Sequence, residues 1–152
     1  MTNNDILRRI LYIFSLSYEK VISIFGEGGK TVTRAEISDW LKRDEDPDFK
    51  ACSDELLATF LNGFIIEKRG RREGPQPVAE RKLTHNIVFW KLKIALNLKA
   101  DDVIDTLGLA NFKISRHELS AFFRKPGHKH YRPCKDQILR NFLQGLQKRE
   151  AD

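Results

Sequence analysis

The sequence predicts an all-α protein made of two tandem four-helix repeats, and three observations lead to this prediction. Residues 2–68 align with residues 84–150 without a gap, at an offset of 82 positions. Apolar residues recur at helical spacing in four segments of each copy. No segment alternates apolar and polar residues for long enough to form a sheet.

The repeat is supported by identity as well as by pattern. Fifteen aligned positions are identical: Thr2/Thr84, Asn4/Asn86, Leu16/Leu98, Val21/Val103, Ile22/Ile104, Gly26/Gly108, Arg34/Arg116, Glu36/Glu118, Ser38/Ser120, Cys52/Cys134, Asp54/Asp136, Leu57/Leu139, Phe60/Phe142, Leu61/Leu143 and Gly63/Gly145. A domain of about 60 residues buries only about 60% of its unfolded surface and is marginally stable. We therefore expect the two copies to share one core around a pseudo-two-fold axis.

The first two helices of each copy follow from capping residues and glycines. The first helix is expected to begin near Asn3 or Asn4, which are good N-cap types, and to run to about Leu16. The second is expected over residues 18–25, with Ser17 as its cap and Gly26 as its stop. The aligned segments of the second copy, including residues 100–107 and Gly108, predict the same pair.

The last two helices of each copy have clearer starts. Thr33 with Glu36, and Ser115 with Glu118, form capping boxes at the same offset, so the third helix begins there. The fourth and longest helix is expected from about residue 53 and again from about residue 135.

A glycine inside the fourth helix of each copy needs an explanation. Gly63 and Gly145 occupy equivalent positions, and a mid-helix glycine costs about 1 kcal/mol relative to alanine. Close approach of another helix would explain both, for example the two fourth helices crossing on the pseudo-two-fold axis. A bend or an end of the helix is the alternative.

Composition divides the chain into three segments. Residues 1–69 form the first repeat, residues 70–82 a Gly, Pro and Arg linker, and residues 83–152 the second repeat. The first repeat has a net charge of −2, the linker +2 and the second repeat +6. One scaffold with opposite charges indicates two different uses.

Length and composition also bear on where the protein acts. No apolar run approaches the ~20 residues that span a bilayer, and the N-terminus lacks the pattern of a signal peptide. The two cysteines, with no secretory signal, favour a reducing compartment. We therefore expect a cytoplasmic protein that does not contact membranes.

Several patterns that would indicate chemistry have simpler interpretations. Residues 26–31 look like a phosphate-binding loop, but the required first glycine is Ile24 and no strand precedes it. Cys52 and Cys134 each precede a helix, where a thiol can become reactive, although a free cysteine usually packs as a small apolar residue.

Two further patterns resemble a zinc site and a helix-turn-helix. His117, His128, His130 and Cys134 lack the paired spacing of structural zinc sites. The second and third helices are ordered as in a helix-turn-helix, but their connection is longer than the usual 3–4 residues. Neither pattern, nor any nucleophile–base set, supports an enzyme, a cofactor or a small-molecule substrate. The partners of Arg34 and Arg116 cannot be read from the sequence.

The loop after the third helix carries the strongest functional signal. In the first copy residues 44–50 are mostly acidic, whereas in the second residues 126–132 are basic, with histidines and an aromatic residue. Clustered cations favour phosphate contacts. The candidate polyanion-binding residues, in the linker and second repeat, are Arg71, Arg72, Arg81, Lys82, Arg124, Lys125, His128, Lys129, His130, Arg132 and Lys135.

Two hypotheses follow for a non-enzymatic binding protein. The first is contact with nucleic acid, RNA or DNA, through the linker and second repeat. The alternative is a protein-interaction module or homo-oligomer in which the acidic loop of one molecule meets the basic loop of another.

Three stretches carry a resemblance to a known family. They are residues 60–70, residues 91–96, and residues 118–145 with Arg124, Pro126, His128, Tyr131, Arg132 and Cys134. Over essentially the full length the chain resembles the YehS-like bacterial proteins of unassigned function. The resemblance implies a bacterial cytoplasmic protein with a duplicated helical domain, and it supplies no catalytic residues or cofactor.

Overall fold

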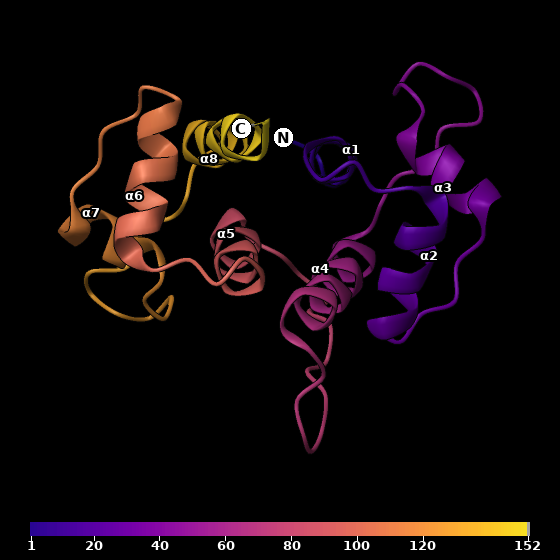
Figure 1. The fold of residues 1–152 in the computed structure, drawn as a ribbon, viewed down its shortest axis with the longest axis horizontal. Helices are drawn as coiled ribbons and strands as arrows, with labels where there is room; N and C mark the ends of the chain where they lie inside the picture. The colour runs from indigo at the N-terminus through magenta and orange to yellow at the C-terminus, as the bar shows by residue number, and fades with distance from the viewer. Residues whose placement is uncertain (152) are drawn as a thin grey trace. The chain divides into compact units, whose positions relative to one another are not determined.

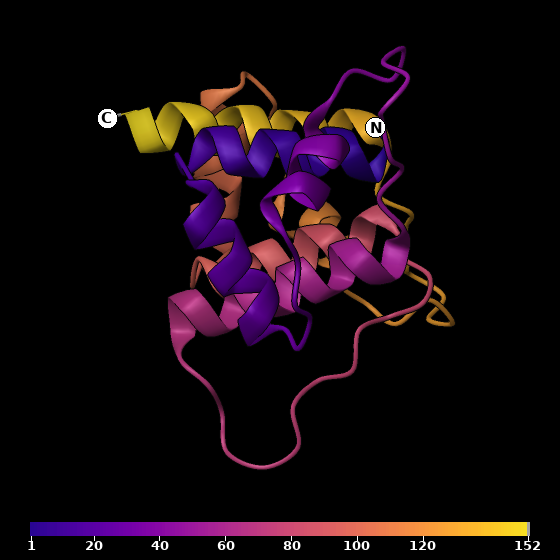
Figure 2. The ribbon, with the colours of Figure 1, turned by 90° about the vertical axis from the view of Figure 1, so that its right-hand side faces the viewer.

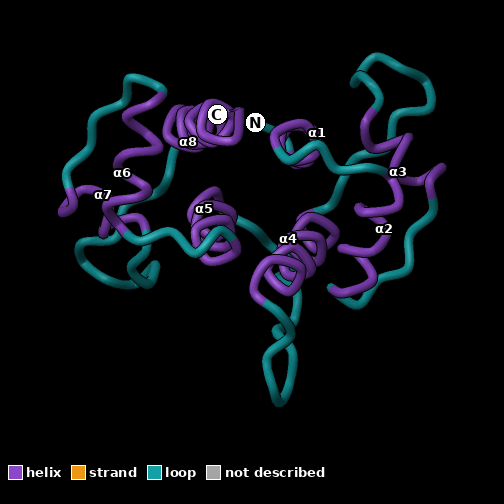
Figure 3. The backbone as a smooth tube through the Cα atoms, in the orientation of Figure 1, coloured by secondary structure: helices purple, strands orange, loops and turns teal. Residues whose placement is uncertain are grey.

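A computed structural model describes residues 1–151 and contains eight α-helices (Figures 1 and 3). The helices are α1 (Asn3–Ile13), α2 (Tyr18–Glu27), α3 (Arg34–Leu41), α4 (Asp54–Arg69), α5 (His85–Ala95), α6 (Ala100–Leu109), α7 (Arg116–Phe122) and α8 (Asp136–Ala151). No strand occurs among the described residues. The chain divides into a first compact unit, Met1–Lys82, and a second that begins at Leu83. The all-α prediction and the four helices of each repeat are confirmed.

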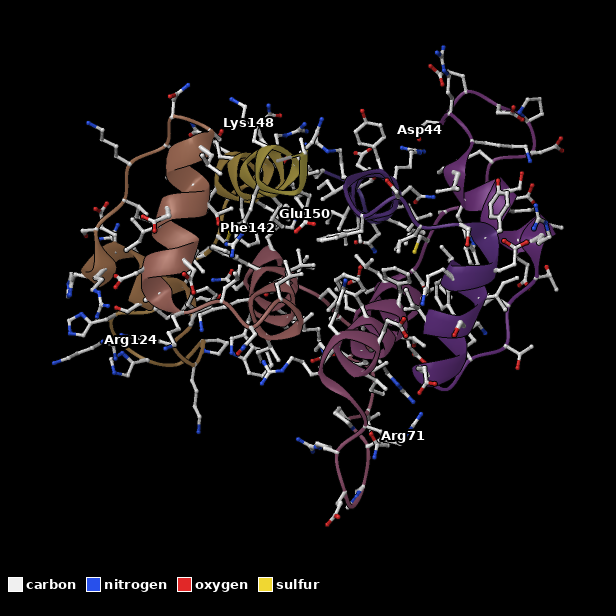
Figure 4. All side chains as sticks on the ribbon, viewed as in Figure 1. Asp44, Arg71, Arg124, Phe142, Lys148 and Glu150 are labelled. Atoms are coloured by element: carbon white, nitrogen blue, oxygen red, sulfur yellow. The ribbon has the colours of Figure 1, made fainter. Side chains whose placement is uncertain are left out.

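Each unit encloses a core of its own, built around a phenylalanine of its last helix. Phe60 packs against Phe25 with ring centroids 5.2 Å apart, and Phe25 lies 5.5 Å from Trp40. In the second unit Phe142 packs against Phe89 at 4.6 Å, and Figure 4 shows Phe142 among the side chains of that core. A core shared by the two units stays a prediction.

The two cores fill similar space with differently placed rings. Phe25 of α2 is aligned with Leu107 of α6, and Leu7 of α1 with Phe89 of α5, so each pair holds one ring and one leucine. All four side chains are fully buried. Packing tolerates such swaps when the total volume is kept.

The predicted capping boxes start α3 and α7. The backbone N–H of Glu36 donates to the Thr33 hydroxyl at 3.1 Å, and Glu118 N–H donates to Ser115 at the same distance. Ser17 caps α2 as predicted. The predicted cap of α1 is wrong: Thr2 is the N-cap residue and accepts from Asp5 N–H.

The predicted ends of the first two helices are also corrected. The first helix ends at Ile13 because Ser15 takes a left-handed backbone with φ 51°, as Asn97 does at φ 54° after α5. Gly26 and Gly108 are not stops but lie inside α2 and α6. The left-handed residues that follow these helices are Gly29 and Asn111.

Gly63 and Gly145 lie at close helix crossings, but the predicted crossing of the two fourth helices is not their cause. A Cβ at Gly63 would lie 1.8 Å from the Ile24 carbonyl oxygen of α2, and one at Gly145 would lie 1.9 Å from the Thr106 oxygen of α6. Each glycine therefore lets the last helix of its unit touch the backbone of the second helix. Figures 1 and 2 show α2 beside α4.

Arg34 and Arg116 make the same contact in both units. Arg34 pairs with Glu19 of α2, and Arg116 pairs with Asp101 of α6 at 2.9 Å. The two acids occupy aligned positions. All four side chains are largely exposed, so these pairs stabilise the units by less than about 1 kcal/mol each.

Cys52 and Cys134 are buried free thiols. Burial raises the pKa of each thiol to about 12. A thiol with so high a pKa is almost entirely protonated near pH 7 and is a poor nucleophile. The packing interpretation of both cysteines is therefore the correct one.

The segment between α4 and α5 forms an extended loop (Figure 2). Its residues up to Lys82 belong to the first unit. Arg71, labelled in Figure 4, pairs with Glu27 at 2.8 Å. Over residues 1–151, no helix is both long and apolar enough to cross a membrane.

Candidate nucleic-acid interface

The basic loop, residues 126–132 of the second unit, is held in place by one buried asparagine. Asn86 of α5 donates from Nδ2 to the carbonyls of Phe122 and Arg132, at 3.0 and 2.8 Å. Its Oδ1 accepts from Cys134 N–H at 2.8 Å. The side chain thus fixes the end of α7 and both residues that follow the turn.

The acidic loop, residues 44–50 of the first unit, is anchored in the same way. Asn4 donates to Trp40 and Lys50 carbonyls, each at 2.9 Å, and accepts from Cys52 N–H at 2.9 Å. Asn4 and Asn86 are among the identical positions of the repeat. The two loops therefore begin and end on equivalent supports.

The turns inside the two loops also share their hydrogen bonds. His128 N–H donates to the Lys125 carbonyl and Tyr131 N–H to the His128 carbonyl, at 2.9 and 3.0 Å. The aligned residues of the acidic loop make the same two bonds at 2.9 and 3.0 Å. A side chain also occupies an equivalent place, since His130 N–H donates to His128 Nδ1 where Asp48 N–H donates to Asp46.

The backbone of the two loops is thus the same while their charges are opposite. Figure 4 shows Asp44 on the loop that follows α3 and Arg124 on the loop that follows α7. The charges are therefore not needed to shape the turn, because either sign is compatible with it.

Beside the basic loop lies a hollow of about 480 Å³, called here the basic hollow. Five Lys or Arg residues line it with a single carboxylate: Lys113, Arg124, Lys129, Arg132, Lys135 and Glu118. His117, His130 and Tyr131 also contribute to its wall. The five cations come from the segment before α7, the segment after it and the start of α8, so folding gathers them.

Glu118 is a single carboxylate among the five cations that line the basic hollow, so most of their positive charge remains. Its carboxylate accepts from Ser115 N–H at 3.1 Å, and this hydrogen bond is the main cause of its lowered pKa, with Arg132 and His117 adding to it. The group is therefore an ionised cap of α7 that offsets one charge of five.

One substitution between the repeats frees a cation at the hollow. In the first unit Lys42 pairs with Asp39 at 2.6 Å. The aligned residues of the second unit are Arg124 and Ala121, so the cation is kept and its acid is lost. Arg124, Lys129 and Lys135 form no ion pair with any residue between 1 and 151.

The structure brings together only part of the predicted site. Arg124, Lys129, His130, Arg132 and Lys135 line the basic hollow. Lys125, next to the basic loop, and His128, within it, are exposed but do not line the basic hollow. The first unit contains the other four residues of the predicted set, Arg71, Arg72, Arg81 and Lys82. None of these four lines the basic hollow.

Three functional contributions were missed in the sequence. Lys113 and His117 line the hollow, although neither was in the polyanion set. Their positions before and in α7 place them next to a loop that follows the same helix. Asn86 was noted only as identical to Asn4, and that identity was the signal of a common role.

The histidines of the basic loop lie close together without forming a metal cluster. The rings of His128 and His130 are 5.5 Å apart. Within the described part of the chain, no group of three or more His, Cys, Asp or Glu side chains could hold a metal ion.

Pro126 and Tyr131 of the basic loop also line a second, more open groove of about 320 Å³, called here the Trp90 groove. Its wall is largely apolar and includes Ile87, Trp90, Phe123 and Pro126. Phe122, Arg124 and Tyr131 line both the groove and the basic hollow, so the two are adjacent.

Comparison with known proteins agrees with the duplication. The family described as "Protein of unknown function (DUF1456)" matches the chain twice, over residues 3–70 and 85–150. The uncharacterized protein YehS of Escherichia coli (strain K12) is 41% identical over 151 residues, which are 99% of this chain and 97% of that protein. No solved structure shows significant similarity. The identity to YehS confirms the resemblance predicted from the sequence, and the two matches, one to each repeat, show that the chain belongs to the DUF1456 family.

Proposed function

We propose that this protein is a non-enzymatic, cytoplasmic binding protein that contacts nucleic acid through the basic hollow of its second repeat. One observation carries the proposal: two loops with the same backbone hydrogen bonds have opposite charges, and the basic one borders a hollow with five cations and one carboxylate. Phosphate groups are the common biological ligand for several unpaired Lys and Arg side chains.

The hollow suits a phosphate backbone in two respects. Its five cations are exposed, and the basic loop that carries Lys129 and Arg132 is fixed at both ends by Asn86, so binding orders little additional chain. Its five cations come from three separate segments of the chain, an arrangement that fits an extended polyanion better than a small anion.

The proposal is tested by a charge reversal with a matched control. Lys129→Glu with Arg132→Glu should weaken binding to a short DNA or RNA at least about tenfold at low salt, because two cations that line the basic hollow become carboxylates that repel phosphate. Arg43→Glu with Lys50→Glu makes the same change in net charge at the acidic loop of the first unit and should alter the affinity little. Fluorescence anisotropy over a salt series measures both.

Salt dependence supplies the second readout. The logarithm of the association constant should fall linearly with the logarithm of salt concentration, with a slope of about −0.7 to −0.9 per phosphate contact. The reversed variant should have a shallower slope than the control. Equal affinities and slopes for the two variants, or no complex at low salt, would contradict the proposal.

The complementary charges of the two loops favour a second candidate, the association of one molecule's acidic loop with another's basic loop. In that case the reversal of Lys129 and Arg132 should weaken self-association, whereas Arg43→Glu with Lys50→Glu makes the acidic loop more negative and should strengthen it. Sedimentation equilibrium of nuclease-treated protein at low and high salt separates this outcome from nucleic-acid binding.

A further inference from the structure

In the first repeat, the residues aligned with the wall of the Trp90 groove form an ionic cluster. Arg8 of α1 donates to the carbonyls of Leu41 and Lys42, at 3.3 and 2.6 Å. It also pairs with Asp5 at 2.9 Å and Asp44 at 3.3 Å. The guanidinium thus covers the end of α3 and ties it to the acidic loop.

Four aligned positions change together in the second repeat. Asp5, Arg8, Leu41 and Asp44 of the first unit correspond to Ile87, Trp90, Phe123 and Pro126 of the second. All four of these replacements line the groove. An ion-paired cluster in the first repeat is therefore replaced by an apolar and aromatic surface in the second. Trp90, which belongs to this surface, is 46% exposed.

The surroundings of the groove restrict its occupant. Arg124 and Lys125 are the charged residues of its wall, and no carboxylate contributes to it. An occupant must therefore present an apolar face to the indole and tolerate, or carry, negative charge. A nucleobase attached to a phosphodiester meets both conditions, and stacking of bases on aromatic side chains is independent of sequence.

The groove lies directly beside the basic hollow. Arg124 and Tyr131 line both, so a chain whose phosphates lie in the hollow has its bases within reach of the groove. A base can turn outward in this way only when it is not paired in a duplex.

We infer that the Trp90 groove is a stacking site for an unpaired base, so that the second repeat binds single-stranded nucleic acid in preference to duplex. This inference rests on the proposed function and adds to it a second contact of different chemistry. The basic hollow supplies the salt-dependent contact with phosphate, and the groove supplies the discrimination between single and double strands.

Intrinsic fluorescence can observe the groove directly because the chain has two tryptophans. Trp40 is buried and its aligned residue is Phe122, so Trp40→Phe should fold and leave Trp90 as the single indole. A single-stranded oligothymidine should quench Trp90. An abasic phosphodiester of equal length should bind at least about tenfold more weakly and leave the emission unchanged.

A matched variant closes the groove without changing the net charge. Ile87→Asp with Trp90→Arg transfers the Asp5–Arg8 pair of the first unit to the second. This variant, and Trp90→Ala, should bind the oligothymidine about tenfold more weakly or worse. Both should bind the abasic strand and duplex DNA as the natural chain does, because the basic hollow is intact.

The outcomes separate the stacking site from the function on which it rests. If both groove variants bind the oligothymidine as tightly as the natural chain while the Lys129 and Arg132 reversal, which changes no residue of the groove wall, abolishes binding, the stacking site is wrong and the phosphate contact stands. If no strand binds the natural chain at low salt, both fail. A change in Trp90 emission with protein concentration alone would assign the groove to a second copy and overturn the inference.

Discussion

Asn86 satisfies three backbone groups with one side chain. The two carbonyls and the N–H that it binds lie 36, 46 and 48 residues away along the chain. Repetition of the same three bonds by Asn4 shows that they support the scaffold, since the loops they hold differ in charge.

Removing this side chain should destabilise the protein strongly. Asn86→Ala should lower the free energy of unfolding by about 3 kcal/mol or more, because each buried backbone group left without a partner costs about 1–3 kcal/mol. Asn141→Ala, on a half-buried position of α8, should change it by less than about 0.5 kcal/mol. Urea denaturation followed by circular dichroism measures the difference, and similar losses for the two variants would show that the three bonds carry no net stability.

The sequence could not predict this role because it depends on distant residues. Identity at positions 4 and 86 marked both asparagines, but local preference made Asn4 a candidate N-cap, a role that Thr2 fills in α1 and Thr84 in α5. Capping boxes were predictable because Thr33 and Glu36 lie within one turn of each other. Partners that lie within a turn can be read from a sequence, whereas a loop more than 40 residues away cannot.

At the scale of the elements, each unit is organised by one close crossing of its second and fourth helices. The sequence correctly predicted that Gly63 and Gly145 permit the close approach of another helix. It did not predict that this helix is the second one of the same unit. The contacted carbonyls belong to Ile24 and Thr106, whose side chains give no sign of a neighbouring backbone. A glycine in a helix reveals that something is near and leaves its identity open.

The crossing gives a prediction with an internal control. Gly145→Ala places a Cβ against the Thr106 carbonyl and should destabilise the protein by about 1–3 kcal/mol, the cost of overpacking. Gly108→Ala lies in α6 with nothing within 4 Å of the new Cβ, and should stabilise it by up to about 1 kcal/mol. Thermal and urea unfolding of the two variants should therefore shift in opposite directions. A stabilised Gly145→Ala would mean that the helices do not touch there.

At the scale of the whole molecule, duplication supplied two equal scaffolds and substitution gave them different surfaces. The charge difference was visible in the sequence, since the repeats carry −2 and +6. The sequence predicted only part of the basic hollow, because Lys113, which precedes α7, also lines it. Ala121 also matters: in the first unit the aligned residue, Asp39, pairs with Lys42, and Ala121 cannot pair with Arg124 in this way. Such effects depend on which side chains face one another, and a charge count cannot supply that.

This view predicts that position, rather than total charge, decides binding. Exchanging residues 43–50 with residues 125–132 keeps the composition and the net charge of +6. Because both loops use the same backbone bonds, the exchanged chain should unfold within about 1 kcal/mol of the natural one, as exposed substitutions generally do. Its affinity for a short single strand should nevertheless fall at least about tenfold, since Lys113, Arg124 and Lys135 would then border an acidic loop. Anisotropy and urea unfolding of the same preparation test both statements. Undiminished affinity would mean that overall charge suffices and that the basic hollow has no special part, whereas a large loss of stability would mean that the loops are not interchangeable despite their common hydrogen bonds.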